Sequence, residues 1–118
     1  MSIMYPIKSE FQKSRAVNKI TMVLPEFITT LFHVIAIPSS LQGKEDFVLT
    51  KSSDTKEMCV TVSPNVNLVK FPNFNVVSIR GRELLKLIPQ NSGVLIVYED
   101  GADYLTAEHV NLFKQIID

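Results

Sequence analysis

The clearest pattern in the chain is an uninterrupted apolar run from Gly93 to Tyr98, which stops at Glu99. The four side chains at 94–97 are all apolar, whereas a strand with one solvent-exposed face alternates polar and apolar residues. We therefore predict a central strand covered on both faces. Helical patterns at 82–88 and 106–117 flank it in the sequence, and we expect them to supply the two coverings.

The rest of the pattern predicts further helices and strands. Apolar residues with helical spacing run from Leu24 to Ile35, and a β-branched run at 34–37 indicates a first strand. Runs at 47–50 and 58–62 are separated by turn residues and predict an antiparallel hairpin. Residues 65–75 follow no single period, so we expect a short helix or an irregular crossing there. A strand at 75–80, a helix at 82–88 and the central strand predict a β-α-β unit, right-handed if its strands are neighbours.

Together these elements predict one domain over 1–118, because 118 residues is the usual size of a single domain. The predicted class is α+β, or mixed α/β: a mixed, mostly antiparallel sheet of about five strands with helices packed on it.

The N-terminal segment, residues 1–19, is expected to form a surface helix. Ser9 and Gln12 have the spacing of a capping box, which predicts a helix that begins near Ser9. Its apolar stripe is thin, so few contacts would hold it, and both a docked and a mobile helix are compatible with the pattern.

Charge is balanced over the whole chain but unevenly distributed. There are 12 basic and 12 acidic residues, which disfavours general nucleic-acid binding. Residues 1–20 carry four cationic side chains and one carboxylate, whereas residues 99–118 carry one lysine and five carboxylates. We expect two solvated surfaces that attract each other; a polar patch for a partner is the alternative.

Cysteine and histidine content favours a cytoplasmic protein without a metal or cofactor. Cys59 is the only cysteine, so no internal disulfide is possible, and its place in an apolar strand indicates a buried structural thiol. His33 and His109 are isolated and belong to no ligand motif. No signal sequence is evident, and Pro25 and Glu26 interrupt the one long apolar stretch, so no membrane segment is expected.

The most site-like stretch runs from Tyr98 to Tyr104, because it leaves the carboxyl end of a buried strand, where open α/β sheets bind ligands. Glu99, Asp100 and Asp103 supply three carboxylates. Their spacing is not that of a calcium loop, although a magnesium or acid–base site is conceivable. The alternative is a solvated turn in which Gly101 adopts a positive φ.

A second candidate is the turn that carries Arg80, Gly81 and Arg82, which passes from a strand into a helix and resembles an anion-binding turn. It lacks the further glycines and the Lys-Ser/Thr pair of a phosphate loop, so a simple strand-to-helix turn is the preferred interpretation. No catalytic motif is present, and we name no catalytic residue.

The order of three stretches resembles the N-terminal domain of the SseB family, a bacterial family named from enhanced serine sensitivity. Residues 25–38, 78–89 and 92–97 read PEFITTLFHVIAIP, SIRGRELLKLIP and SGVLIV, and a predicted hairpin separates the first two. The resemblance covers about residues 20–117. The chain departs from it after the central strand, where Tyr98-Glu99-Asp100-Gly101 replaces an Asn-Pro-Gly type of turn, and the C-terminal domain of larger members is missing.

The resemblance implies a mixed α/β fold and no established catalytic residues, with loose links to secretion and toxin immunity. We therefore expect a non-enzymatic, cytoplasmic protein-interaction module, either a secretion-associated adaptor or an immunity protein, whose partner is another protein. Its expected contact residues are Tyr98, Glu99, Asp100, Asp103 and Tyr104. The alternatives are a ligand-binding or enzymatic domain whose crevice joins Arg80 and Arg82 to residues 99–103, and a homodimer that pairs sheet edges.

Overall fold

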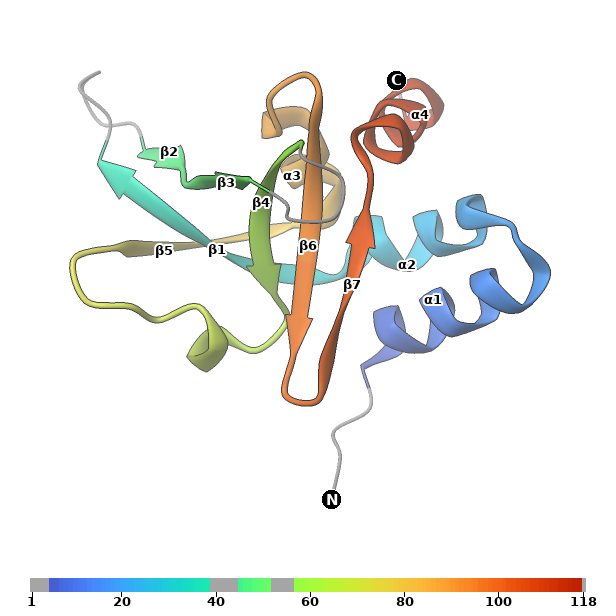
Figure 1. Ribbon diagram of the computed structural model, residues 1–118, viewed down its shortest axis with the longest axis horizontal. Coiled ribbons are helices and arrows are strands. Elements are labelled where there is room, and N and C mark those ends of the chain that lie inside the picture. Colours follow the sequence, from blue (N-terminus) through green and yellow to red (C-terminus); the bar gives the residue numbers. More distant parts are fainter. Residues whose placement is uncertain (1–4, 39–44, 52–56, 118) are drawn as a thin grey trace.

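The computed structural model describes residues 5–38, 45–51 and 57–117 (Figure 1). Its helical elements are α1 (Pro6–Val17), η1 (Ile20–Val23), α2 (Leu24–Thr29), η2 (Val66–Leu68), α3 (Gly81–Leu87) and α4 (Ala107–Ile117). Its strands are β1 (Leu31–Pro38), β2 (Glu45–Phe47), β3 (Leu49–Lys51), β4 (Met58–Ser63), β5 (Asn75–Arg80), β6 (Ser92–Tyr98) and β7 (Gly101–Leu105).

The strands form one mixed sheet, and the α+β prediction is confirmed. β1 pairs with β5 along one side and with β2 and β4 along the other, while β3 lies against β4. β6 lies between β4 and β7, as expected of a central strand. Among the pairs that the described residues form, only β4 with β6 is parallel. The sheet has seven strands rather than about five for two reasons. The stretch predicted as one strand at 47–50 falls into two three-residue strands, β2 and β3, and β7 was not predicted.

One hydrophobic core lies between the sheet and the helices. All four α-helices contribute to it, together with alternate residues of β1, β4 and β6, among them Phe27, Phe32, Val62, Leu85, Ile96 and Phe113. The helices therefore share one face of the sheet, and the prediction that helices cover both faces of β6 is wrong. Leu95 and Val97, on the other face of β6, are only partly buried.

The helix expected up to Ile35 ends at Thr29, and β1 begins at Leu31. Burial along β1 alternates, with Phe32, Val34 and Ala36 buried, so the period of two prevails over the helical spacing that some of the same residues also fit. The Thr30 hydroxyl donates to the Glu26 carbonyl at 2.7 Å, which gives the backbone an alternative to a further helical turn.

α1 is a docked helix. It begins at Pro6, because proline suits the first helical position, and the predicted capping box at Ser9 does not form its N-terminus. Ile7 and Phe11 are almost fully buried within the core. The thin apolar stripe therefore consists of a few residues that are deeply inserted.

Several predicted elements have the expected positions. β3 and β4 form the predicted antiparallel hairpin, whose turn falls outside the described residues. α4 follows Thr106, whose hydroxyl accepts from the His109 N–H at 3.1 Å, as in an N-cap.

The two strands of the predicted β-α-β unit are not neighbours, because β5 pairs with β1 and not with β6.

Candidate functional site

The acidic stretch predicted as a strand-to-helix loop is a β-hairpin. β6 ends at Tyr98, Glu99 and Asp100 form the turn, and β7 begins at Gly101. Gly101 does not adopt the left-handed φ that the sequence suggested. Because the chain turns back into the sheet, the strand end is not the open crevice where α/β sheets bind ligands.

Helix α1 binds this hairpin through ion pairs. Arg15 Nη1 lies 2.6 Å from Asp103 Oδ1, and Lys8 Nζ lies 2.6 Å from Asp100 Oδ1. The Tyr98 hydroxyl donates to Asp103 Oδ2 at 2.9 Å. The basic N-terminal segment and the acidic C-terminal segment therefore attract each other within one molecule, as the charge distribution predicted.

Two tyrosines complete the contact. The rings of Tyr5 and Tyr98 stack with centroids 5.7 Å apart, and the Tyr5 hydroxyl donates to Glu99 Oε1 at 2.7 Å. Asn65 Nδ2 donates to the same oxygen at 2.6 Å. We call the set Tyr5, Lys8, Arg15, Tyr98, Glu99, Asp100 and Asp103 the hairpin clasp.

Proton affinities in the hairpin clasp follow from these contacts. Burial, and then the hydrogen bond to Glu99, raise the pKa of Tyr5 to about 12. Hydrogen bonds from Tyr5 and Asn65 lower the pKa of Glu99, and the hydrogen bond from Lys8 lowers that of Asp100. Burial and the Asp103 carboxylate raise the pKa of Tyr98. These shifts keep Glu99 and Asp100 ionised and Tyr5 and Tyr98 protonated at neutral pH.

Only some of the five predicted contact residues are exposed to solvent. Tyr98 and Asp103 are each only 6% exposed, so in this conformation they lack the surface that a partner would contact. Glu99 and Asp100 are exposed at the hairpin turn. Tyr104 is partly buried, and its ring lies against the backbone of Gly93 on β6.

The two arginines of the second candidate lie elsewhere. Arg80 and Arg82 line a surface pocket of about 450 Å³, whose other lining residues are Ile28, Thr29 and Glu83. Arg80 Nη1 donates to the Thr29 carbonyl at 2.9 Å. No hairpin residue lines this pocket, so the crevice predicted to join the arginines to 99–103 is not formed by the described residues.

The cysteine and His33 have surroundings that indicate a structural role. Cys59 is buried in β4, as predicted. His33 lies on β1 rather than on a helix, its Nδ1 is 2.7 Å from the Ser78 hydroxyl, and partial burial lowers its pKa. Within the described parts of the chain, no cluster of three potential metal ligands occurs.

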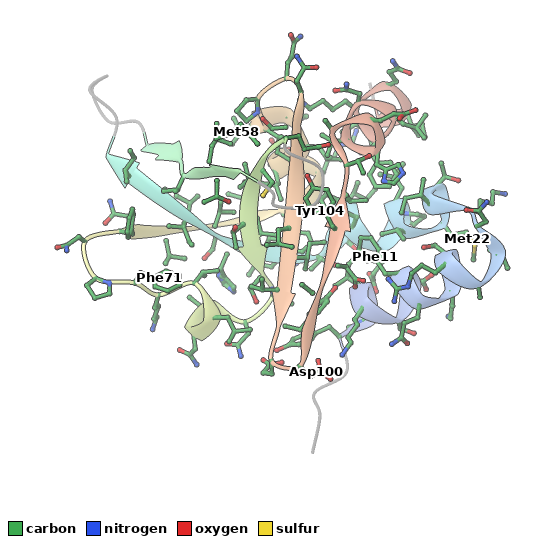
Figure 2. All side chains as sticks on the ribbon, in the orientation of Figure 1. Phe11, Met22, Met58, Phe71, Asp100 and Tyr104 are labelled. Atoms are coloured by element: carbon green, nitrogen blue, oxygen red, sulfur yellow. The ribbon has the colours of Figure 1, made fainter. Side chains whose placement is uncertain are left out.

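The sequence reasoning missed an exposed aromatic turn at residues 71–74. The Phe74 N–H donates to the Phe71 carbonyl at 3.3 Å, Pro72 occupies the second position, and Asn73 has a φ of 71°. These features are those of a type II turn. Phe71 is 51% exposed and Phe74 42% (Phe71 is labelled in Figure 2). The signal was present in the sequence as a Pro-Asn pair between two phenylalanines.

The aromatic turn adjoins the face of the sheet that the helices leave uncovered. Asn75 pairs with Ala36, so continuing the register brings Phe74 beside Ile37, which is 41% exposed. Ile35 and its cross-strand partner Val76 continue this apolar strip with partly exposed side chains.

No protein-family model, curated protein or solved structure matches the chain. Among the described residues, no helix has both the length and the apolar character that crossing a membrane requires.

Proposed function

We propose that the chain is a non-enzymatic protein-interaction module that works in the cytoplasm and binds another protein through the aromatic turn. The observation that carries this proposal is the pair of half-exposed phenylalanines held by one rigid turn. Exposed aromatic side chains are typical anchors of protein interfaces.

The geometry of the turn favours binding. Pro72 and the Asn73 backbone restrict the turn before any partner arrives, so little conformational entropy is lost on association. Ile37 and Phe74 extend the apolar surface onto the sheet. A partner with an apolar groove or a flat aliphatic patch fits this surface.

The hairpin clasp has a different role in the proposal. Asp100 and Asp103 form ion pairs with Lys8 and Arg15 of α1. The proposed contact with the partner therefore moves from the predicted 98–104 region to the aromatic turn. The resemblance to the SseB family supports a secretion-associated adaptor or an immunity protein as the biological setting.

Affinity capture of the tagged protein from its native cytoplasm tests this function. Phe71→Ser with Phe74→Ser removes both anchors, while Leu87→Ser removes an equally exposed apolar side chain from α3 and serves as the matched control. We expect a stoichiometric partner that the turn variant loses and the Leu87 variant keeps. A partner retained by the turn variant but lost on Asp100→Lys would place the interface on the hairpin instead.

A second candidate function rests on the pocket beside Arg80 and Arg82, where two guanidinium groups border a surface hollow. A small anion bound there at a hundred times its dissociation constant adds about 2.7 kcal/mol to the free energy of unfolding. A thermal-shift screen with Arg82→Ala as control tests it. Light scattering separates both functions from a homodimer that pairs sheet edges.

A further inference from the structure

Strand β5 is an exposed edge of the sheet. Among the described strands, β5 pairs only with β1 and β7 only with β6, so these two strands form the opposite ends of the sheet (Figure 1). All six residues of β5 pair with β1 in one continuous register. Asn75, Ser78 and Arg80 are exposed, and the other three are half-buried. The outer side of β5 is therefore open along a complete strand.

The register shows which backbone groups of β5 face outward. The Gly81 N–H donates to the Thr30 carbonyl at 2.9 Å, so these two residues form a hydrogen-bonded pair at the end of the ladder. Hydrogen-bonded and non-hydrogen-bonded pairs alternate along antiparallel strands. The N–H and C=O groups of Val76, Ser78 and Arg80 therefore point away from β1, and no strand of the described residues pairs with them.

This edge lacks the usual protection against pairing. Soluble proteins blunt an edge strand with proline, lysine, a bulge or a covering segment. Residues 75–80 read NVVSIR, with three β-branched apolar side chains, no proline and no lysine, and only Arg80 at the end is charged. At the other end of the sheet, Asp103 of β7 is paired with Arg15 of α1. β5 is thus the edge that is suited to accept a further strand.

The charges around β5 indicate what that strand is. Arg82 follows β5, and Lys70 precedes the aromatic turn that leads into it. Both are exposed, and within the part of the chain that the structure describes no carboxylate pairs with either. Glu83 lies 3.4 Å from Lys86 instead. A second copy of the chain would bring the same cations to this edge and be repelled, whereas an acidic segment is attracted.

We propose that β5 binds an extended, acidic segment of the partner protein as an additional strand. The backbone of the segment bonds to the outward groups of β5, and its carboxylates face Lys70 and Arg82. In strand addition of this kind, main-chain hydrogen bonds supply the affinity and side chains the specificity. The inference rests on the proposed function, because it names the part of the partner that the chain binds, and Phe74 directly precedes β5.

Titration of the full-length ¹⁵N-labelled chain with two synthetic peptides tests the proposal. The acidic probe is acetyl-ETVTVTE-amide, and the same peptide with lysine in place of both glutamates is the charge control. We expect saturable downfield shifts of the amide protons of Val76, Ser78 and Arg80, whereas the amides at 75, 77 and 79, which already bond to β1, should move little. The acidic probe should bind about fivefold more tightly than the lysine probe.

A pair of variants at Ser78 isolates the outward backbone donor. Ser78→Pro removes this N–H without removing a bond to β1, which is where an edge strand accepts proline. Ser78→Ala is the matched control, because it keeps the N–H and both variants lose the hydroxyl contact with His33. The proline variant should bind the acidic probe about tenfold more weakly than the alanine variant.

The proposal is overturned if the shifts at about 10 mM probe do not alternate along β5, if the lysine probe binds as tightly, or if Ser78→Pro binds like Ser78→Ala. The alternation is measured in the wild type, so it decides the matter even if the proline variant does not fold. A free chain that sediments as a dimer, and that Ser78→Pro makes monomeric, would overturn the proposal by assigning the edge to a second copy. If the Phe71→Ser, Phe74→Ser variant loses the captured partner while β5 does not respond to either probe, strand addition is refuted and the proposed function stands.

Discussion

Replacing Phe11 by alanine tests whether α1 is an integral part of the fold. The side chain is 2% exposed and belongs to the same core cluster as the strand residues Val94 and Ile96. In a mobile surface helix, the same substitution would have almost no effect on stability.

The magnitude follows from the burial. A buried aromatic side chain removes about 150–250 Å² from water, which at about 25 cal/mol per Å² gives an upper limit of about 4–6 kcal/mol. Measured truncations of buried phenylalanine to alanine cost about 3–5 kcal/mol. Against a total free energy of unfolding of about 5–15 kcal/mol, the variant should be strongly destabilised.

Urea denaturation followed by circular dichroism measures this difference. Val17→Ala is the control, because Val17 lies on the same helix and is 60% exposed, and it should change the free energy of unfolding by less than about 0.5 kcal/mol. If Phe11→Ala costs less than about 1 kcal/mol, α1 does not contribute to the core as described.

Three further outcomes are expected. Gly81→Ala should lower the free energy of unfolding by about 1–3 kcal/mol or more, because the added Cβ would overlap the backbone carbonyl of Phe27. Gly101→Ala should be tolerated, because no heavy atom lies within 4 Å of the added Cβ. Thermal melts of the two variants test the difference. The lowered pKa values of Glu99 and Asp100 stabilise the folded state above about pH 4, and this stability is lost as the pH falls through the lowered values. In acid, the urea midpoint of the wild type should therefore approach that of the Glu99→Gln, Asp100→Asn variant. The raised pKa of Tyr5 contributes stability that is complete below about pH 10 and lost as the pH rises towards about 12, and Tyr5→Phe should remove this alkaline loss in urea melts.

The sequence predicted much of the sheet because strand signals are local. The apolar run at Gly93 to Tyr98 and the strand at 75–80 appear as β6 and β5, and the hairpin of β3 with β4 was recognised from its turn residues. The sequence did not predict the end of α2 at Thr29 and the start of β1 at Leu31. Residues spaced for a helix also alternate along a strand, and only pairing with β5 decides between them.

The site was harder to predict because it depends on contacts between distant segments. The charge imbalance indicated attraction between the two ends of the chain, but no local pattern shows that Arg15 meets Asp103 or that α1 covers Tyr98. The hairpin acids looked like a free surface because nothing in their neighbourhood along the chain neutralises them. The aromatic turn could have been recognised, since its Pro-Asn pair is a local signal.

Site-specific photo-crosslinking in the native host tests the central claim most directly. A benzophenone side chain replaces Phe74 in one protein and Leu87 in another, so that both carry the probe at an exposed apolar position. The proposed function predicts one discrete crosslinked protein from position 74 and none from position 87. No adduct at 74, or the same adducts at both positions, would contradict binding through the aromatic turn.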